Sequence, residues 1–263
     1  MRLFLKILRL SFRRQLTYRT ATLAGLVTNL FFGVLRASVL IALFNAQPSV
    51  NGLTVKGAVT FAGLTQGVIA YLSIFGWWDI MQSIEKGSIG ADLLKPMNFF
   101  TYWLAQDIGR AAAQFVTRGL VLMIAFGFLF QITLPASPAQ WLAFAFALIL
   151  SGLVSFAWRF IINLAAFWSP NAIGFGRFAF SLTWIFSGFA MPLRLFPDWF
   201  QQFCAFTPFP AMINTVIEIF LGTLTPPETL QALLLQAAWF VGLSILSQFI
   251  LKAGIRRLVI QGG

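Results

Sequence analysis

Long apolar stretches dominate this chain and constrain its fold more than any other feature. A membrane-spanning helix needs about 20 mostly apolar residues, and six segments reach that scale: 22–44, 56–78, 104–131, 140–167, 174–193 and 228–251. Hydrophobic residues make up 59% of the 263 residues and charged residues 10%, against roughly 45–50% and about 25% in soluble domains. A soluble globular enzyme and a disordered chain are therefore excluded. The sequence predicts an all-α polytopic membrane protein with six transmembrane helices, forming a single domain over 1–263.

A seventh apolar stretch, 198–222, is interrupted by Pro208 and Pro210. Proline breaks a helix because it lacks the backbone N–H and clashes with the preceding turn. Fewer than 20 uninterrupted residues remain on either side of the breaks. We therefore expect 194–224 to be a re-entrant helical hairpin before the last span, shielded by the rest of the bundle.

Basic residues indicate which side of the membrane each segment faces. The net charge is +11, from 18 Lys and Arg against 7 Asp and Glu, and Lys and Arg concentrate on cytoplasmic segments of membrane proteins. One side of the predicted spans carries the basic residues within 2–19, 86–110, 177 and 252–257, whereas the other side carries Lys56 and Arg194. The bias predicts that both termini and the 79–100 segment are cytoplasmic.

Residues 1–20 have the pattern of an amphipathic helix. At about 100° per residue, Arg2, Lys6, Arg9 and Arg13 share a narrow stripe, and apolar side chains occupy the remainder. Lys6 and Arg9 interrupt any apolar core of a signal peptide. We expect a helix that lies on the inner leaflet, acting either as an anchor and orientation signal or as a contact for a partner.

Several chemistries are missing from the sequence. There is no His, and the single cysteine, Cys204, cannot form an internal disulfide or a multi-thiolate metal site. No Gly-Lys dipeptide occurs, so a Walker A loop is absent. We therefore expect no catalytic, cofactor or metal site in this chain, and no binding of nucleic acid.

The polar segment 79–100, between the second and third predicted spans, has the pattern of a short capped helix. Gly87 suits the stop of a helix that continues from the second span, Ser88 is suited to cap a new one, and Pro96 ends it. The new helix, 89–95, would expose Ile89, Leu93 and Leu94. Two turns are not stable alone, so this helix would dock into another protein; the alternative is a loop packed on the membrane surface.

Three blocks of sequence resemble one family of transporters. Glu-x-Gly-Ser-Ile-x-x-x-Leu-Leu-x-Pro at 85–96 is similar to the Glu-x-Gly-Thr-Leu-x-x-Leu-Leu-x-x-Pro pattern of type 2 ABC export permeases, with slightly different spacing. Ser-Gly-Phe-Ala-Met-Pro-Leu-x-x-Phe-Pro-x-Trp at 187–199, and Thr-Pro-Phe-Pro at 207–210 followed by Ile-Phe-Leu-Gly at 219–222, resemble their later segments. Together the blocks cover most of the chain. It looks most like bacterial permeases of poorly characterised systems in which two different permeases pair.

The resemblance implies partners and roles. Two cytoplasmic ABC ATPase subunits, which bind ATP and Mg, would drive two permeases, identical or different, in a bacterial plasma membrane. Export of an amphiphilic or drug-like substrate would follow by alternating access. The residues that couple the permease to the ATPase would be Glu85, Gly87, Ser88, Ile89, Asp92, Leu93, Leu94 and Pro96.

Two further groups of apolar residues are candidates for the transport path. Phe189, Met191, Pro192 and Leu193 would form an outer gate above it. Aromatic residues of the second and fifth spans would line a cavity between paired subunits, or simply pack; if they line it, stacking and cation–π contacts favour flat or cationic amphiphiles. These residues are Tyr71, Phe75, Trp78, Phe180 and Trp184.

Ionisable residues also occur inside the predicted spans: Arg36, Asp107, Arg118 and Arg159. Such groups are costly in lipid and face the bundle or water. Asp107 is spaced to pair with Arg110 one turn later, and Arg118 needs a partner. These residues either form a polar wall of the transport path or, as we favour, bond helices together. Buried arginines also suit an ATPase-independent secondary transporter, although its usual inverted repeat is not visible.

Overall fold

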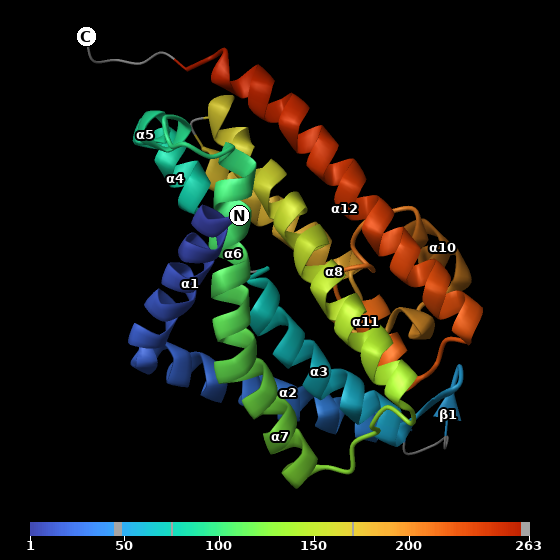
Figure 1. Cartoon of the computed structure of the whole chain (residues 1–263). Coiled ribbons are helices and arrows are strands. Elements are labelled where there is room, and N and C mark those ends of the chain that lie inside the picture. Colours follow the sequence, from blue (N-terminus) through green and yellow to red (C-terminus); the bar gives the residue numbers. More distant parts are fainter. Residues whose placement is uncertain (45–48, 75, 170, 259–263) are drawn as a thin grey trace.

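The computed structural model describes residues 1–44, 49–74, 76–169 and 171–258. They form a bundle of helices with one small β-hairpin at its edge (Figure 1). In chain order the elements are α1 (Arg2–Thr17), α2 (Arg19–Phe44), β1 (Ser49–Val50), β2 (Leu53–Thr54), α3 (Val55–Leu72), α4 (Asp79–Glu85), α5 (Ile89–Leu93), α6 (Phe99–Gln114), the π-helix η1 (Phe115–Gly119), α7 (Leu120–Leu129), α8 (Pro138–Leu164), the 3₁₀ turn η2 (Ala165–Phe167), α9 (Ala172–Phe186), the 3₁₀ turn η3 (Leu193–Leu195), α10 (Asp198–Ala205), α11 (Asn214–Leu221) and α12 (Pro226–Ile255).

The predicted all-α polytopic membrane protein is confirmed. Within the described ranges, five helical segments are long and apolar enough to cross a membrane: 19–44, 55–72, 99–129, 138–167 and 226–255. The fifth predicted span, 174–193, is instead the shorter apolar helix α9. Its 15 residues extend about 22 Å, less than the roughly 30 Å of a hydrocarbon core. The backbone turns at Gly188, whose φ is +81°.

The second predicted span, 56–78, extends beyond Leu72, where the observed helix α3 ends. Thr54 caps α3 by accepting a hydrogen bond from the Gly57 N–H at 3.1 Å. The helix stops at Leu72 because Ser73 adopts the left-handed conformation, with φ of +51°. The helix α4 therefore begins anew at Asp79 instead of continuing the span.

Small residues on α3 allow close packing at the centre of the bundle. A Cβ on Gly63 would come within 2.5 Å of the Phe126 ring on α7, and one on Gly67 would lie 3.3 Å from the Gly119 carbonyl oxygen of η1. Most side chains of α3 are buried, and Figure 1 shows this helix between α2, α6–α7 and α8. Both glycines therefore serve packing within the chain.

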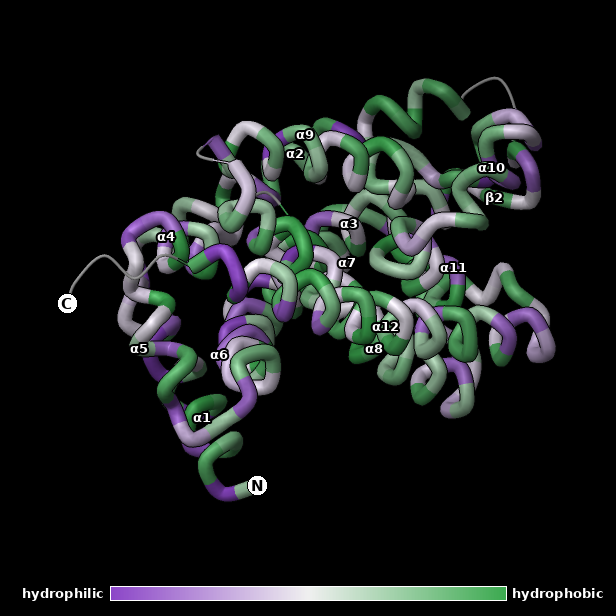
Figure 2. Tube along the Cα trace, turned by 90° about the horizontal axis from the view of Figure 1, so that it is seen from above, coloured by the Kyte–Doolittle hydropathy of each residue, from purple (hydrophilic) through white to green (hydrophobic). Residues whose placement is uncertain are grey.

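The N-terminal helix α1 packs against α6 with its apolar side. Ser11 donates a hydrogen bond to the Gln106 carbonyl at 2.6 Å, and a Cβ on Gly109 would come 2.3 Å from the Leu8 carbonyl oxygen. The basic side chains of α1 are exposed on the opposite side. In Figure 1 the ribbon of α1 runs across the direction shared by α8 and α12, and Figure 2 shows hydrophilic stretches on α1 and near α4.

The region 194–224 is not a straight spanning helix. It contains two helices of eight residues each, α10 and α11, separated by the segment that holds Pro208 and Pro210. Buried side chains of α11, including Val216 and Ile217, join the main core. The expected pair of short helices is therefore present and packs against the bundle, and its re-entry into the membrane stays a prediction.

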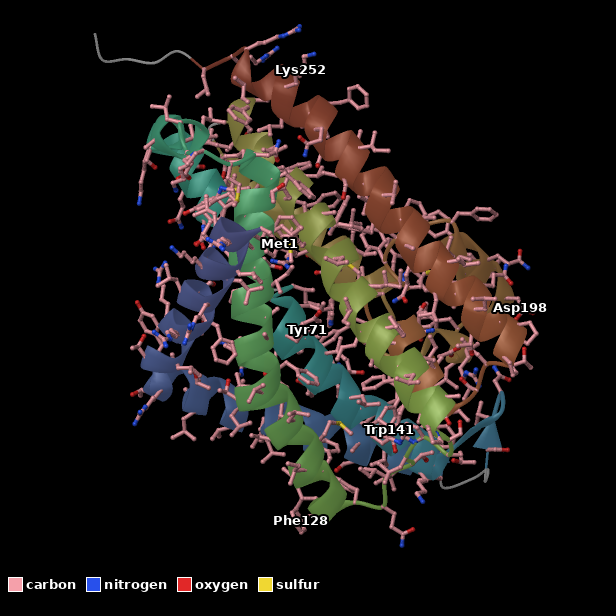
Figure 3. All side chains as sticks on the ribbon, viewed as in Figure 1. Met1, Tyr71, Phe128, Trp141, Asp198 and Lys252 are labelled. Atoms are coloured by element: carbon pink, nitrogen blue, oxygen red, sulfur yellow. The ribbon has the colours of Figure 1, made fainter. Side chains whose placement is uncertain are left out.

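The orientation remains a prediction, and thiol labelling tests it. Lys252 and Asp198 lie toward opposite ends of the molecule (Figure 3). In a Cys204→Ser background, an impermeant thiol reagent should label Ser49→Cys and Asp198→Cys in intact cells, and Ser88→Cys only after lysis. All three positions are exposed, so access through the membrane decides the outcome. Labelling at 88 but not at 49 in intact cells would reverse the orientation.

Candidate functional site

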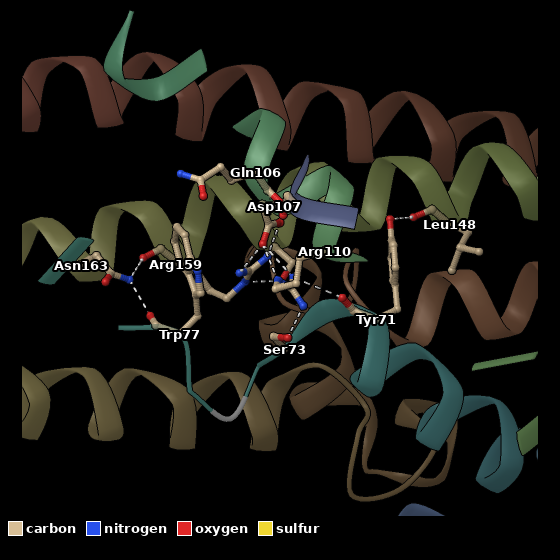
Figure 4. A network of polar contacts seen from close by, with 11 residues as sticks. Tyr71, Ser73, Trp77, Gln106, Asp107, Arg110, Leu148, Arg159 and Asn163 are labelled. Atoms are coloured by element: carbon tan, nitrogen blue, oxygen red, sulfur yellow. Dashed lines mark hydrogen bonds and ion pairs between the residues drawn. The ribbon is translucent and has the colours of Figure 1, made fainter. Parts of the chain in front are cut away.

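A buried ionic network joins α6 to α8. Arg159 donates two hydrogen bonds to the Asp107 carboxylate, at 3.0 and 2.8 Å, and Arg110 binds the same carboxylate at 2.7 Å. The side chains of Asp107 and Arg159 are 4% and 1% exposed. The expected pairing of Asp107 with Arg110 is present (Figure 4). One carboxylate thus serves two guanidinium groups.

The same network holds the segment that joins α3 to α4. Arg110 donates to the Ser73 hydroxyl and, at 3.4 Å, to the Tyr71 carbonyl. Asn163 on α8 donates to the Trp77 carbonyl at 2.9 Å and accepts from the Met81 N–H at 3.0 Å. The contact between Asn163 and Trp77, drawn in Figure 4, and the contact with Met81 therefore attach the start of α4 to α8. This geometry supports interhelical bonding for Asp107 and Arg159.

The short helix α5 differs from its prediction in three respects. It covers five residues, Ile89–Leu93, and Ser88 makes no cap; its hydroxyl instead donates to Ser83. Ile89, expected to be exposed, is fully buried in the apolar cluster of Phe99 and Trp103. The exposed apolar surface is consequently smaller than predicted for a helix that exposes Ile89, Leu93 and Leu94.

The end of α4, the helix α5 and the residues up to 96 form a compact tip, 85–96, that is exposed to solvent. Gly87 has φ of +71° and stops α4 as expected. Leu94 is 87% exposed, whereas Leu93 is half-buried. Asp92 pairs with Lys95 at 2.5 Å. Of the predicted coupling residues, those exposed at this tip are Glu85, Gly87, Ser88, Leu94 and Pro96.

A hydrogen-bonded turn follows α9 where the outer gate was expected. Phe189 is 5% exposed, and the Arg36 guanidinium of α2 lies 3.9 Å from its ring centroid. Arg36 also donates to the Phe189 carbonyl at 2.7 Å. Asn214 of α11 accepts from the Leu193 N–H at 3.0 Å. Pro192 and Leu193 are buried and Met191 is half-buried.

The aromatic residues expected on a common path lie in separate places within this chain. Tyr71 lines a cavity of about 450 Å³ beside α6 and α8, where its hydroxyl donates to the Leu148 carbonyl. Trp184 lines another, of about 310 Å³, together with Arg36. Trp78 packs edge-on against Phe180, with ring centroids 4.9 Å apart. Phe75 lies outside the described residues.

The family comparison agrees with these features. A family model described as an ABC-2 family transporter protein matches residues 30–262. The chain belongs to the ABC-2 transporter family. A comparison with curated proteins gave no match. The resemblance of the three sequence blocks to ABC permeases is thus confirmed, and the chain is a multi-pass membrane component of an ABC transporter.

The hydrogen-bond partners of several polar residues in this ABC-2 family chain were not anticipated. Ser73 and Asn163 complete the network, and Gln114 accepts a hydrogen bond from Arg118 at 3.3 Å. Asn163, Arg159 and Ser155 recur every four residues on α8, so periodicity marks their common face. This periodicity does not reveal that Arg159 is paired with Asp107, which lies 52 residues away in the sequence.

Proposed function

We propose that this ABC-2 family chain is the permease subunit of an exporter driven by a separate cytoplasmic ATPase. Membership of the family implies association with an ABC ATPase. Two ATPase subunits and a second permease, identical or different, complete the transporter, in a bacterial plasma membrane with both termini in the cytoplasm. ATP and Mg bind to the ATPase subunits.

The observation that carries this proposal is the exposed tip of α4 and α5. Leu94 is exposed on the same tip as Glu85 and Ser88, and a short projecting helix of this kind, which is not stable alone, suits insertion into a groove of a partner protein. The Asn163 contacts that fix the start of α4 to α8 would let a displacement of this tip reach the bundle. Coupling of ATP hydrolysis to transport requires such a connection.

Purification of the native complex tests the proposal. The tagged chain should copurify with an ABC ATPase, and a photocrosslinker placed at residue 94 should attach to that ATPase. Vesicles containing the complex should move substrate only with hydrolysable ATP. Transport that persists without the ATPase, driven by an ion gradient, would favour the secondary transporter instead.

The segment around Phe189 is proposed as the outer gate, and Met191→Ala tests it. Shortening this half-buried side chain thins an apolar barrier without disturbing the hydrogen bonds of Asn214. We expect basal ATP turnover or substrate leak to rise about two- to tenfold, the effect of a barrier lowered by roughly 0.4–1.4 kcal/mol. Phe206→Ala, an exposed residue of the same outer region, should leave both rates unchanged. Unchanged basal turnover and leak in a well-assembled Met191→Ala complex would contradict a gate here.

A further inference from the structure

A groove with several polar side chains runs between α2, α3 and α9 and reaches Ser73 of the ionic network. Its one part, about 310 Å³, is lined by residues including Asn29, Arg36, Gln66 and Trp184. Its other part, about 280 Å³, is lined by residues including Asn29, Ile69 and Arg118. The two parts meet at Asn29 and Ile69, so two guanidinium groups share one groove.

The carboxylates of the chain do not neutralise these two arginines. All seven Asp and Glu residues are among those the structure describes. Asp107, Glu218 and Asp92 are paired with other basic residues, and none of the seven lines the groove. In the described part of the chain, neither Arg36 nor Arg118 forms an ion pair.

Hydrogen-bond donors are also in excess in this groove. Arg118 gives one guanidinium N–H to Gln114, but its buried Nε has no partner among the described residues. The buried Nε2 of Gln66 is likewise without a described partner, while Asn29 donates to the Gln66 carbonyl at 3.3 Å. Buried donors left unpaired are costly, and an anion would satisfy several at once.

The backbone is shaped to receive Arg118. A Cβ on Gly25 of α2 would come within 2.5 Å of the Arg118 Nη2 atom, so a side chain there would require the guanidinium to shift. Arg36 lies 11 residues further along α2, a rise of about 16 Å, beside Phe189. The groove thus offers two cationic positions at different depths along the same helix.

We propose that this groove binds the anionic headgroup, a phosphate or carboxylate, of an amphiphile. Arg118 holds the headgroup at one depth and Arg36 at the other, next to the proposed outer gate. The apolar tail extends past Phe32 of α2 and Trp184 of α9, exposed side chains that line the groove, into surrounding lipid. Two arginines that form no ion pair with the described residues disfavour the cationic amphiphile that aromatic stacking alone suggested. The transport role rests on the proposed function, but the binding does not.

A binding titration on the chain without ATPase tests the inference, so its outcome is independent of the proposed function. The full chain in phosphatidylcholine nanodiscs is titrated with tail-labelled phosphatidylglycerol and with tail-labelled phosphatidylcholine of the same acyl chains. We expect phosphatidylglycerol to bind at least tenfold more tightly. The double variant Arg36→Gln/Arg118→Gln should lose about 10- to 100-fold of that preference. Lys252→Gln/Arg256→Gln, which removes two exposed charges at the end of α12, should retain it.

A second variant keeps both charges and changes only their position. Gly25→Ala pushes the Arg118 guanidinium out of place and should weaken phosphatidylglycerol binding at least threefold. Gly242→Ala, where a Cβ meets nothing within 4 Å, should bind as the wild type does. This pair decides the matter if the double arginine variant fails to fold.

Competition with dodecyl phosphate distinguishes the sources of the anion. Competition supports a site for phosphate-bearing amphiphiles in general, including a transported one. Phosphatidylglycerol binding without competition supports a site for a bilayer lipid headgroup. Equal affinity of the wild type for both lipids, or an equal loss in the Lys252→Gln/Arg256→Gln control, would overturn the inference.

Discussion

Asp107→Ala is expected to destabilise the folded chain by about 3–5 kcal/mol, the usual cost of removing one partner from a buried ion pair. The substitution leaves the Arg110 and Arg159 guanidinium groups facing each other without a carboxylate. Arg159 is buried too deeply, at 1% exposure, to regain its interactions from water. We expect a lower melting temperature in detergent and a smaller monodisperse fraction after purification.

Two further variants show whether this loss arises from unpaired buried charge. Asp198→Ala, at an exposed acidic residue, should melt with the wild type. Asp107→Asn combined with Arg159→Gln removes one charge of each sign and should recover part of the stability that Asp107→Ala loses. A melting temperature for Asp107→Ala within a degree of the wild type would contradict the network's structural role.

Leu94→Asp should abolish substrate-stimulated ATP turnover while leaving membrane insertion and folding intact. Leu94 is exposed, so its replacement costs the isolated chain little, whereas a carboxylate in an apolar groove of a partner is strongly unfavourable. Leu93 is less suitable for this test because it is half-buried and its loss would disturb the fold. ATP hydrolysis by the reconstituted complex, with and without substrate, is the measurement.

Phe206→Asp supplies the matched control for Leu94→Asp. Phe206 is 84% exposed and lies between α10 and α11, in the outer region. Its replacement introduces the same charge far from the proposed ATPase and should leave stimulation unchanged. Stimulated turnover that survives Leu94→Asp, in a complex that still contains the ATPase, would remove α5 from the coupling pathway.

The existence of the spans could be predicted from sequence because hydrophobic length is a property of each segment alone. The ends of the spans could not be predicted where the backbone conformation of a single residue ends the helix. Ser73 stops α3 through a left-handed conformation that serine rarely adopts, and the turn at Gly188 shortens the fifth predicted span. No sequence pattern distinguishes Ser73 from helix interior, whereas Gly188 is of the residue type that commonly follows a helix end.

The candidate sites show the same division between local and tertiary information. The stop at Gly87 followed from a local preference, as did the pairing of Asp107 with Arg110 one helical turn away. The sequence predicted that Ile89 faces outward. Its burial depends on Phe99 and Trp103, which lie beyond Pro96, and no local pattern shows that they pack against it. The link from Asp107 to Arg159 needed the packing of α6 on α8.

The interruption between α3 and α4 has a mechanical consequence. Asn163 binds the Trp77 carbonyl just before α4 and the Met81 N–H in its first turn. The position of α4 is therefore fixed to α8. A displacement of the α5 tip would therefore be transmitted to α8 and, through Asp107, to α6. The left-handed residue Ser73 separates α3 from α4. The helix α3 can therefore stay packed against its neighbours while α4 and α8 move.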